Sequence, residues 1–61
     1  MLRYRFQFVG ARPRPRPNHV YRDAPIVQGT LELYSATRYV VESVDEEENP
    51  PVAVLRKVRR L

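Results

Sequence analysis

The N-terminal segment alternates apolar and polar side chains with a period of two. In Leu2–Val9 the sequence reads Leu-Arg-Tyr-Arg-Phe-Gln-Phe-Val, so that large apolar residues stand at every second position. Successive side chains leave a β-strand on opposite faces, and this period therefore predicts a strand with one buried face. We expect Phe6 and Phe8 to be core residues and Arg3 and Arg5 to be solvated.

The segment that follows cannot continue the strand. After Gly10, residues 11–18 read Ala-Arg-Pro-Arg-Pro-Arg-Pro-Asn. Proline lacks the backbone donor of helices and central strands, and it pushes the residue before it into extended conformations. We therefore expect a polyproline II loop at residues 11–18.

The middle of the chain predicts two further extended segments. The first runs from about His19 to Tyr34, is interrupted at residues 23–25 (Asp-Ala-Pro), and contains Gly29 at a bulge or a close-packing point. Leu31 and Leu33 are expected to point inward there. The second, Thr37–Val44, is rich in β-branched and aromatic residues and is expected to pair with the first through a turn at residues 35–36. Its alternation places Tyr39 and Val41 on one face, with Val40 and Val44 on the other.

The C-terminal segment fits two structures. Residues 45–51 (Asp-Glu-Glu-Glu-Asn-Pro-Pro) predict a solvated connection, after which Val52, Val54 and Val58 fit a strand. Residues 52–61 also fit a helix, because Val54, Leu55, Val58 and Leu61 have the spacing of one helix face and Pro50 can start such a helix. The excess of β-branched residues favours the strand. The chain is thus expected to be one all-β domain, residues 1–61, built as a small barrel or a curled antiparallel sheet of four or five short strands.

The length and the absence of cysteine limit how this domain can be stabilised. A chain of 61 residues buries only about 60% of its unfolded surface, and without cysteine it has no disulfides. The additional stability must then come from tight packing, from association with a second copy or from docking on another molecule. The sequence has no apolar run near the roughly 20 residues that cross a bilayer and no signal-peptide core. We therefore expect a cytoplasmic protein with no membrane span.

Three segments resemble the strand, strand, turn, strand order of SH3-like small barrels. They are residues 29–33 (Gly-Thr-Leu-Glu-Leu), residues 38–44 (Arg-Tyr-Val-Val-Glu-Ser-Val) and residues 51–55 (Pro-Val-Ala-Val-Leu), and a long loop follows the first strand. The resemblance implies a binding module, because SH3-like barrels of many families bind peptides, RNA, DNA or other proteins and rarely catalyse. The acidic and aromatic pattern with which eukaryotic signalling domains bind proline-rich ligands is missing, so that activity is not implied.

Charge is sorted into three blocks along the chain. Residues 1–22 hold six arginines and no acid, residues 23–49 hold seven acids and one arginine, and residues 50–61 hold four cations and no acid. Basic surfaces of this kind attract anions. The candidate anion-binding residues are Arg3, Arg5, Arg12, Arg14, Arg16, Arg56, Lys57, Arg59 and Arg60.

The Arg-Pro tract has two interpretations. In polyproline II the rise is about 3.1 Å per residue, which spaces Arg12, Arg14 and Arg16 by about 6 Å and rotates each by about a third of a turn from the last. A groove that encloses the segment would contact all three guanidinium groups. In the alternative, the tract is a stiff, soluble loop whose arginines pair with the acids of residues 46–48 or with solvent.

Catalytic and metal-binding chemistry has little support in this sequence. His19 is the single histidine, there is no cysteine, and no nucleophile is evidently paired with a base. The acidic run lacks the spacing and the glycine of a calcium loop. We therefore expect no enzyme activity, no metal and no cofactor. Tyrosine is enriched at binding surfaces, and Tyr21 and Tyr34 are the candidates for an interaction surface.

Two functions remain. In the leading hypothesis, the chain is a non-catalytic module that binds an anionic partner, nucleic acid, through its basic N-terminal strand, the Arg-Pro loop and the basic tail. In the alternative, it is a protein-interaction module, such as a small inhibitor or assembly factor of bacterial or viral type, whose basic and acidic patches dock on a protein or on a second copy. The acidic middle block discriminates between the two, because a nucleic-acid binder gains nothing from acids near its contact surface, whereas a docking protein can use both signs of charge. The sequence does not identify the partner, the choice between DNA and RNA, or the oligomeric state.

Overall fold

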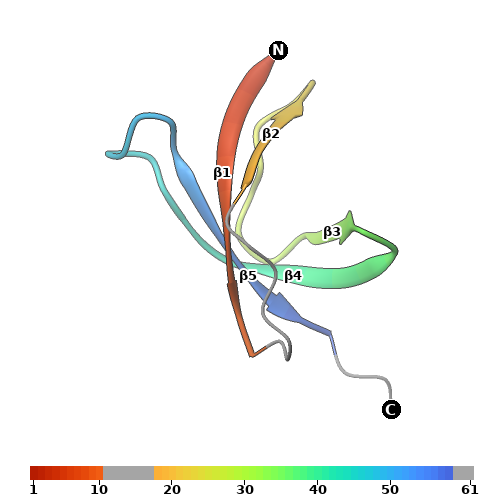
Figure 1. Cartoon of the computed structure of the whole chain (residues 1–61). Helices are drawn as coiled ribbons and strands as arrows, with labels where there is room; N and C mark the ends of the chain where they lie inside the picture. Colours follow the sequence, from red (N-terminus) through yellow and green to blue (C-terminus); the bar gives the residue numbers. More distant parts are fainter. Residues whose placement is uncertain (11–17, 59–61) are drawn as a thin grey trace.

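The computed structural model, which describes residues 1–10 and 18–58, consists of β-strands joined by turns. The strands are β1 (Leu2–Val9), β2 (Asn18–Arg22), β3 (Leu31–Tyr34), β4 (Thr37–Asp45) and β5 (Val52–Lys57) (Figure 1). The all-β class is thus confirmed. The predicted polyproline II loop falls on residues 11–17, which lie outside the described residues, and Asn18 already belongs to β2.

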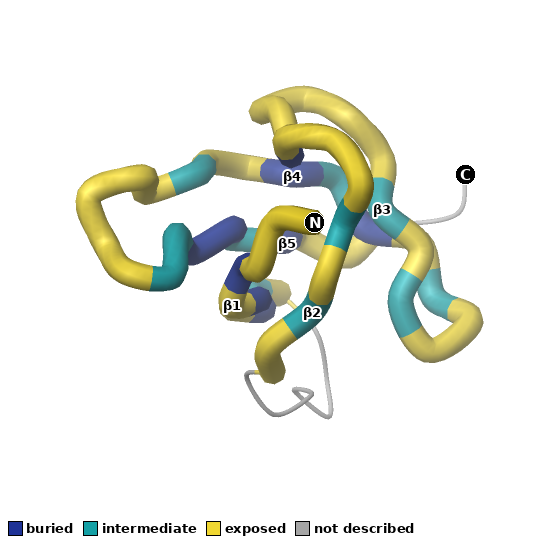
Figure 2. Tube along the Cα trace, turned by 90° about the horizontal axis from the view of Figure 1, so that it is seen from above, coloured by how far each residue is buried: buried dark blue, intermediate teal, exposed yellow. Residues whose placement is uncertain are grey.

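The five strands form one curled sheet in the order β2-β1-β5-β4-β3. Three neighbouring pairs are antiparallel, but β1 and β5 are parallel, so the sheet is mixed rather than wholly antiparallel. Parallel neighbours need a long crossover connection, and here β2, β3 and β4 supply it. Seen from above, the sheet curls into a half-barrel, and the buried positions of its strands lie on β1, β4 and β5 (Figure 2).

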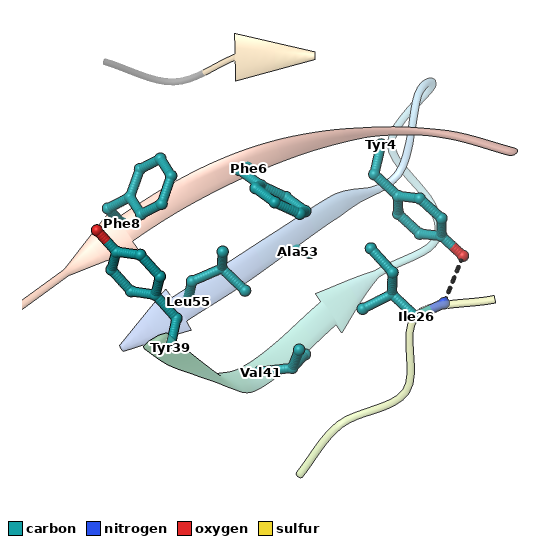
Figure 3. Packing of buried hydrophobic residues seen from close by; sticks show 8 residues of the cluster. All are labelled: Tyr4, Phe6, Phe8, Ile26, Tyr39, Val41, Ala53 and Leu55. Carbon is teal, nitrogen blue, oxygen red and sulfur yellow. Dashed lines mark hydrogen bonds between the residues drawn. The ribbon is translucent and has the colours of Figure 1, made fainter. Parts of the chain in front are cut away.

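The alternating residues of β1 place three large aromatic side chains on one side of the core. Phe6 and Phe8 are buried, as predicted, and Tyr4 is buried beside them, whereas Arg3 and Arg5 are exposed on the opposite face. The hydroxyl of Tyr4 accepts a hydrogen bond of 3.0 Å from the backbone N–H of Ile26, which satisfies the buried polar group (Figure 3). The core cluster consists of Tyr4, Phe6, Phe8, Ile26, Tyr39, Val41, Ala53 and Leu55.

The hairpin of β3 and β4 corrects the prediction for Leu31 and Leu33. Both leucines are exposed, each at 65%, because the register pairs Glu32 with the buried Tyr39 and so turns Glu32 and Tyr34 toward the inside. The two-residue turn at Ser35 and Ala36 was predicted correctly, and its positive φ angles of 50° and 62° fit a hairpin turn. A strand with apolar residues on both faces does not reveal which face is buried, and here the register decides it.

A bulge in β4 changes the face of Val44. Val41 pairs with Leu55 and Ser43 with Val54, so Glu42 is the extra residue on β4. Tyr39 and Val41 are buried on one face, as predicted. Val44, predicted on the other face, packs against the core instead, because one extra residue reverses the alternation beyond it.

The C-terminal segment is a strand and not a helix over Val52–Lys57. β5 lies between β1 and β4, where Ala53 and Leu55 are fully buried. Residues 45–51 were expected to be a solvated connection; residues 45–49 are exposed, whereas Pro50 and Pro51 are half-buried. Gly29 was predicted at a bulge or a close-packing point, but it lies in a turn with open space where a Cβ would stand, so the close-packing prediction is wrong; its φ of +90° favours glycine.

Side chains bridge the two edge strands, β2 and β3. The guanidinium of Arg22 donates to the carboxylate of Glu32, at 2.8 Å from Nη2 and 3.2 Å from Nε to Oε1, and it lies 5.3 Å from the ring centre of Phe6. The amide of Asn18 donates to the hydroxyl of Tyr34 at 3.1 Å. These contacts join edges between which no ladder of backbone hydrogen bonds is formed.

Candidate anion-binding surface

Two of the predicted arginines stand side by side on the convex surface of the sheet. Arg3 and Arg5 occupy the exposed face of β1, and the antiparallel pairing places Tyr21 opposite Arg3 and His19 opposite Arg5. All four side chains are exposed. We call Arg3, Arg5, His19 and Tyr21 the outer β1–β2 face.

The spacing of this face follows from strand geometry. Residues two apart on one antiparallel strand are separated by about 7 Å, and paired strands lie about 5 Å apart. The four side chains therefore form a compact patch with two guanidinium groups along one side. Because they stand on paired strands, their backbone positions are fixed before any ligand binds.

Arg3 and Arg5 differ from Arg22 and Arg56 in having no ion-pair partner among the described residues, and they share this property with the exposed Arg38 of β4. The ion pairs found within residues 1–10 and 18–58 are Arg22–Glu32 and Arg56–Glu42. Arg3 and Arg5 thus have no carboxylate partner in this part of the chain. Their charge is available to an external anion.

The positive face has an acidic boundary on one side. In the sheet, Arg5 pairs with Val52 of β5, and Val52 pairs in turn with Asp45 of β4. Asp45 begins the exposed acidic connection, and its carboxylate accepts a hydrogen bond of 3.1 Å from the backbone N–H of Glu47. The negative charge of Asp45 and of the connection after it therefore repels a phosphate that extends from Arg5 toward β4.

The remaining predicted cations are not gathered at this face. Arg56 lies on the outer surface of β5 and forms an ion pair with Glu42, which raises the pKa of Arg56 through the hydrogen bond and the charge of the carboxylate. Lys57 pairs in register with the buried Tyr39 and is exposed at the end of β5. Arg12, Arg14, Arg16, Arg59 and Arg60 lie outside the described residues.

The two candidate tyrosines have different surroundings. Tyr21 is 57% exposed on the outer β1–β2 face. The ring of Tyr34 packs at 5.7 Å from Phe6 and 5.3 Å from Phe8, measured between ring centres, while its hydroxyl binds Asn18. Of the pair, Tyr21 is therefore the residue whose ring faces solvent.

Sequence reasoning missed two features of the surface. It did not join His19 to the arginines, because their proximity depends on the register of β1 and β2, to which no local pattern points. It also missed an exposed apolar patch on the outer face of β3, β4 and the end of β5. This patch consists of the exposed Leu31, Leu33 and Val58 together with the half-buried Val40, with Arg38 opposite Leu33.

Comparison of the chain with protein-family models, with curated proteins and with solved structures finds no significant match. In the described part of the chain, no group of three or more histidine, aspartate or glutamate side chains is arranged to hold a metal ion. The same residues contain no helix that is long and apolar enough to span a membrane.

Proposed function

We propose that this chain is a non-catalytic module that binds nucleic acid through the outer β1–β2 face, together with the Arg-Pro tract that connects these strands in the sequence. The observation that carries the proposal is the exposure of Arg3 and Arg5, side by side and without carboxylate partners among the described residues. The SH3-like resemblance and a cytoplasmic location are part of the same hypothesis.

Phosphate is the anion that suits this arrangement. Guanidinium groups donate several hydrogen bonds in a fixed plane to phosphate oxygens, and phosphate contacts supply most of the affinity of nonspecific nucleic-acid binding. Two arginines on one strand present two such donors at a fixed separation. The net charge of +4 adds long-range attraction to the same partner.

The salt dependence of binding tests this proposal. We expect the chain to bind a short DNA oligonucleotide at low salt, and Arg5→Gln to reduce the slope of log affinity against log salt by about 0.7–0.9, the contribution of one phosphate. Arg38→Gln is the matched control, because it removes the same charge from an exposed position on β4. Replacing Arg12, Arg14 and Arg16 together with glutamine measures the share of the tract in the same titration.

Two outcomes would count against the proposal. Equal changes of slope in Arg5→Gln and Arg38→Gln would mean that net charge matters and the outer β1–β2 face does not. The absence of any binding at low salt would exclude nucleic acid as the ligand of this face.

The exposed apolar patch favours protein docking as a second candidate function. Leu31 and Leu33 are each 65% exposed on neighbouring positions of one strand face, and such patches mark interaction surfaces. The double variant Leu31→Ser, Leu33→Ser should keep the melting temperature nearly unchanged, because both side chains are solvated. If docking is the function, a protein captured from nuclease-treated lysate should be lost with this variant and retained with Arg5→Gln. Capture that nuclease abolishes would favour nucleic acid instead.

A further inference from the structure

We infer that the ligand of the outer β1–β2 face is single-stranded nucleic acid, with a base stacked on Tyr21 and backbone phosphates on Arg3 and Arg5. This inference rests on the proposed function and adds the class of nucleic acid to it. The residue that decides the class is Tyr21, because an aromatic ring can stack only on a base whose face is accessible.

Tyr21 differs from the other aromatic residues of the chain. Phe6, Phe8, Tyr4 and Tyr39 are buried in the core, and Tyr34 packs against it. Tyr21 is instead 57% exposed. It lies on the outer face of β2, while the neighbouring Val20 packs against the core from the inner face. A large exposed ring does not contribute to packing inside the barrel, and it stands directly opposite an arginine with no ion-pair partner in the described residues.

The shape of the surface disfavours a duplex. The outer β1–β2 face lies on the convex side of a curled five-stranded sheet, opposite the side on which Tyr4, Phe6 and Phe8 of β1 join the core cluster. The major groove of DNA accepts a helix or a two-stranded ribbon, whereas β1 and β2 continue through β5 into a five-stranded sheet that is wider than such a ribbon. A flexible single strand can follow a convex surface and turn its bases toward it.

The charges around the face determine the path of that strand. Asp45 and the acidic connection after it repel phosphates on the β4 side of Arg5. Arg3 and Arg5 attract them along β1, and Tyr21 and His19 line the neighbouring strand. The single strand therefore runs along β1 and β2 rather than across the sheet, with its phosphates over β1 and a base over β2.

Fluorescence anisotropy at low salt tests the inference. The probes are labelled oligothymidylate, oligouridylate and a short DNA hairpin duplex, and the variants are Tyr21→Val and Tyr21→Phe. We expect both single strands to bind more tightly than the hairpin. Tyr21→Val should weaken single-strand binding by about 5- to 150-fold, the effect of losing one stacked base, while Tyr21→Phe should keep most of the affinity. The two homopolymers distinguish DNA from RNA as the preferred strand.

Several results would overturn the inference. Equal or tighter binding of the hairpin would do so while leaving the proposed function intact, and so would unchanged single-strand affinity in Tyr21→Val. Should that variant unfold, nuclear magnetic resonance of the wild-type chain replaces it: the ring protons of Tyr21 must shift when oligothymidylate binds, and their failure to shift contradicts stacking. A chain that binds none of the three probes refutes the proposed function itself.

Discussion

Replacing Phe6 with alanine is expected to remove most of the stability of this domain. The ring is fully buried, and its centre lies 6.1 Å from that of Phe8, 5.7 Å from that of Tyr34 and 5.3 Å from the guanidinium of Arg22. Truncating a buried phenylalanine costs about 3–5 kcal/mol. A domain of this size has roughly 3–9 kcal/mol in total. Thermal unfolding followed by circular dichroism should therefore show Phe6→Ala largely unfolded or melting far below the wild type.

Leu33→Ala is the matched control for this change. It also truncates a large apolar side chain on a strand, but Leu33 is 65% exposed on the outer face of β3. Its free energy of unfolding should stay within about 0.5 kcal/mol of the wild type. Similar losses in the two variants would contradict the assignment of inner and outer faces.

The existence of β1, β4 and β5 could be predicted from the sequence because each carries a local signal, whereas the extended region expected at residues 19–34 forms strands only as β2 and β3, with residues 23–30 outside them. In β1 the large apolar residues fall on one face only, so the period of two also identified Phe6 and Phe8 as core. In β5 the β-branched residues distinguished a strand from a helix that the spacing equally allowed. The hairpin turn at Ser35 and Ala36 followed from the two apolar segments on either side of it.

The faces of β3 and the end of β4 could not be predicted, because they depend on contacts distant in sequence. Leu31 and Leu33 alternate with Glu32 and Tyr34, and hydrophobicity alone selects the leucines for the core. The structure packs the half-buried ring of Tyr34 against Phe6 and Phe8 and pairs Glu32 with Arg22. The arginine that β2 presents to the same side supplies the counter-ion that Glu32 needs in this half-buried position.

Only the part of the candidate site that lies on β1 could be predicted, because the rest depends on contacts distant in sequence. The exposed face of β1 follows from its alternation, so Arg3 and Arg5 could be placed on the surface from the sequence. Which residues of β2 stand beside them depends on pairing across the Arg-Pro tract. The pairing of Arg56 with Glu42, the extra residue of the β4 bulge, joins residues on two strands and could not be inferred from a local pattern.

The bridge between Arg22 and Glu32 is expected to hold the two edge strands together. Without hydrogen-bonded backbone pairing between β2 and β3, side chains are what joins these edges. Arg22 is held from three sides, since its Nη1 also donates to the carbonyl of Tyr21 at 2.9 Å and its guanidinium lies over Phe6. Removing the carboxylate leaves a partly buried cation without its counter-ion. Allowing for the partial exposure of Arg22, we expect Glu32→Gln to lower the free energy of unfolding by about 1–2 kcal/mol.

Glu42→Gln is the matched control. It tests whether the loss of stability in Glu32→Gln comes from the position of the ion pair between the edge strands rather than from the loss of one negative charge. It makes the same substitution in the pair with Arg56, but there the side chains are 54% and 43% exposed and join β5 to β4, which are already hydrogen-bonded neighbours. Exposed pairs contribute little, so this variant should melt close to the wild type. Native-state hydrogen exchange should show faster exchange in β2 and β3 for Glu32→Gln, with β1 and β5 protected as before. Equal melting temperatures in the two variants, or unchanged exchange at the edges, would mean that the curl of the sheet is maintained by the core alone.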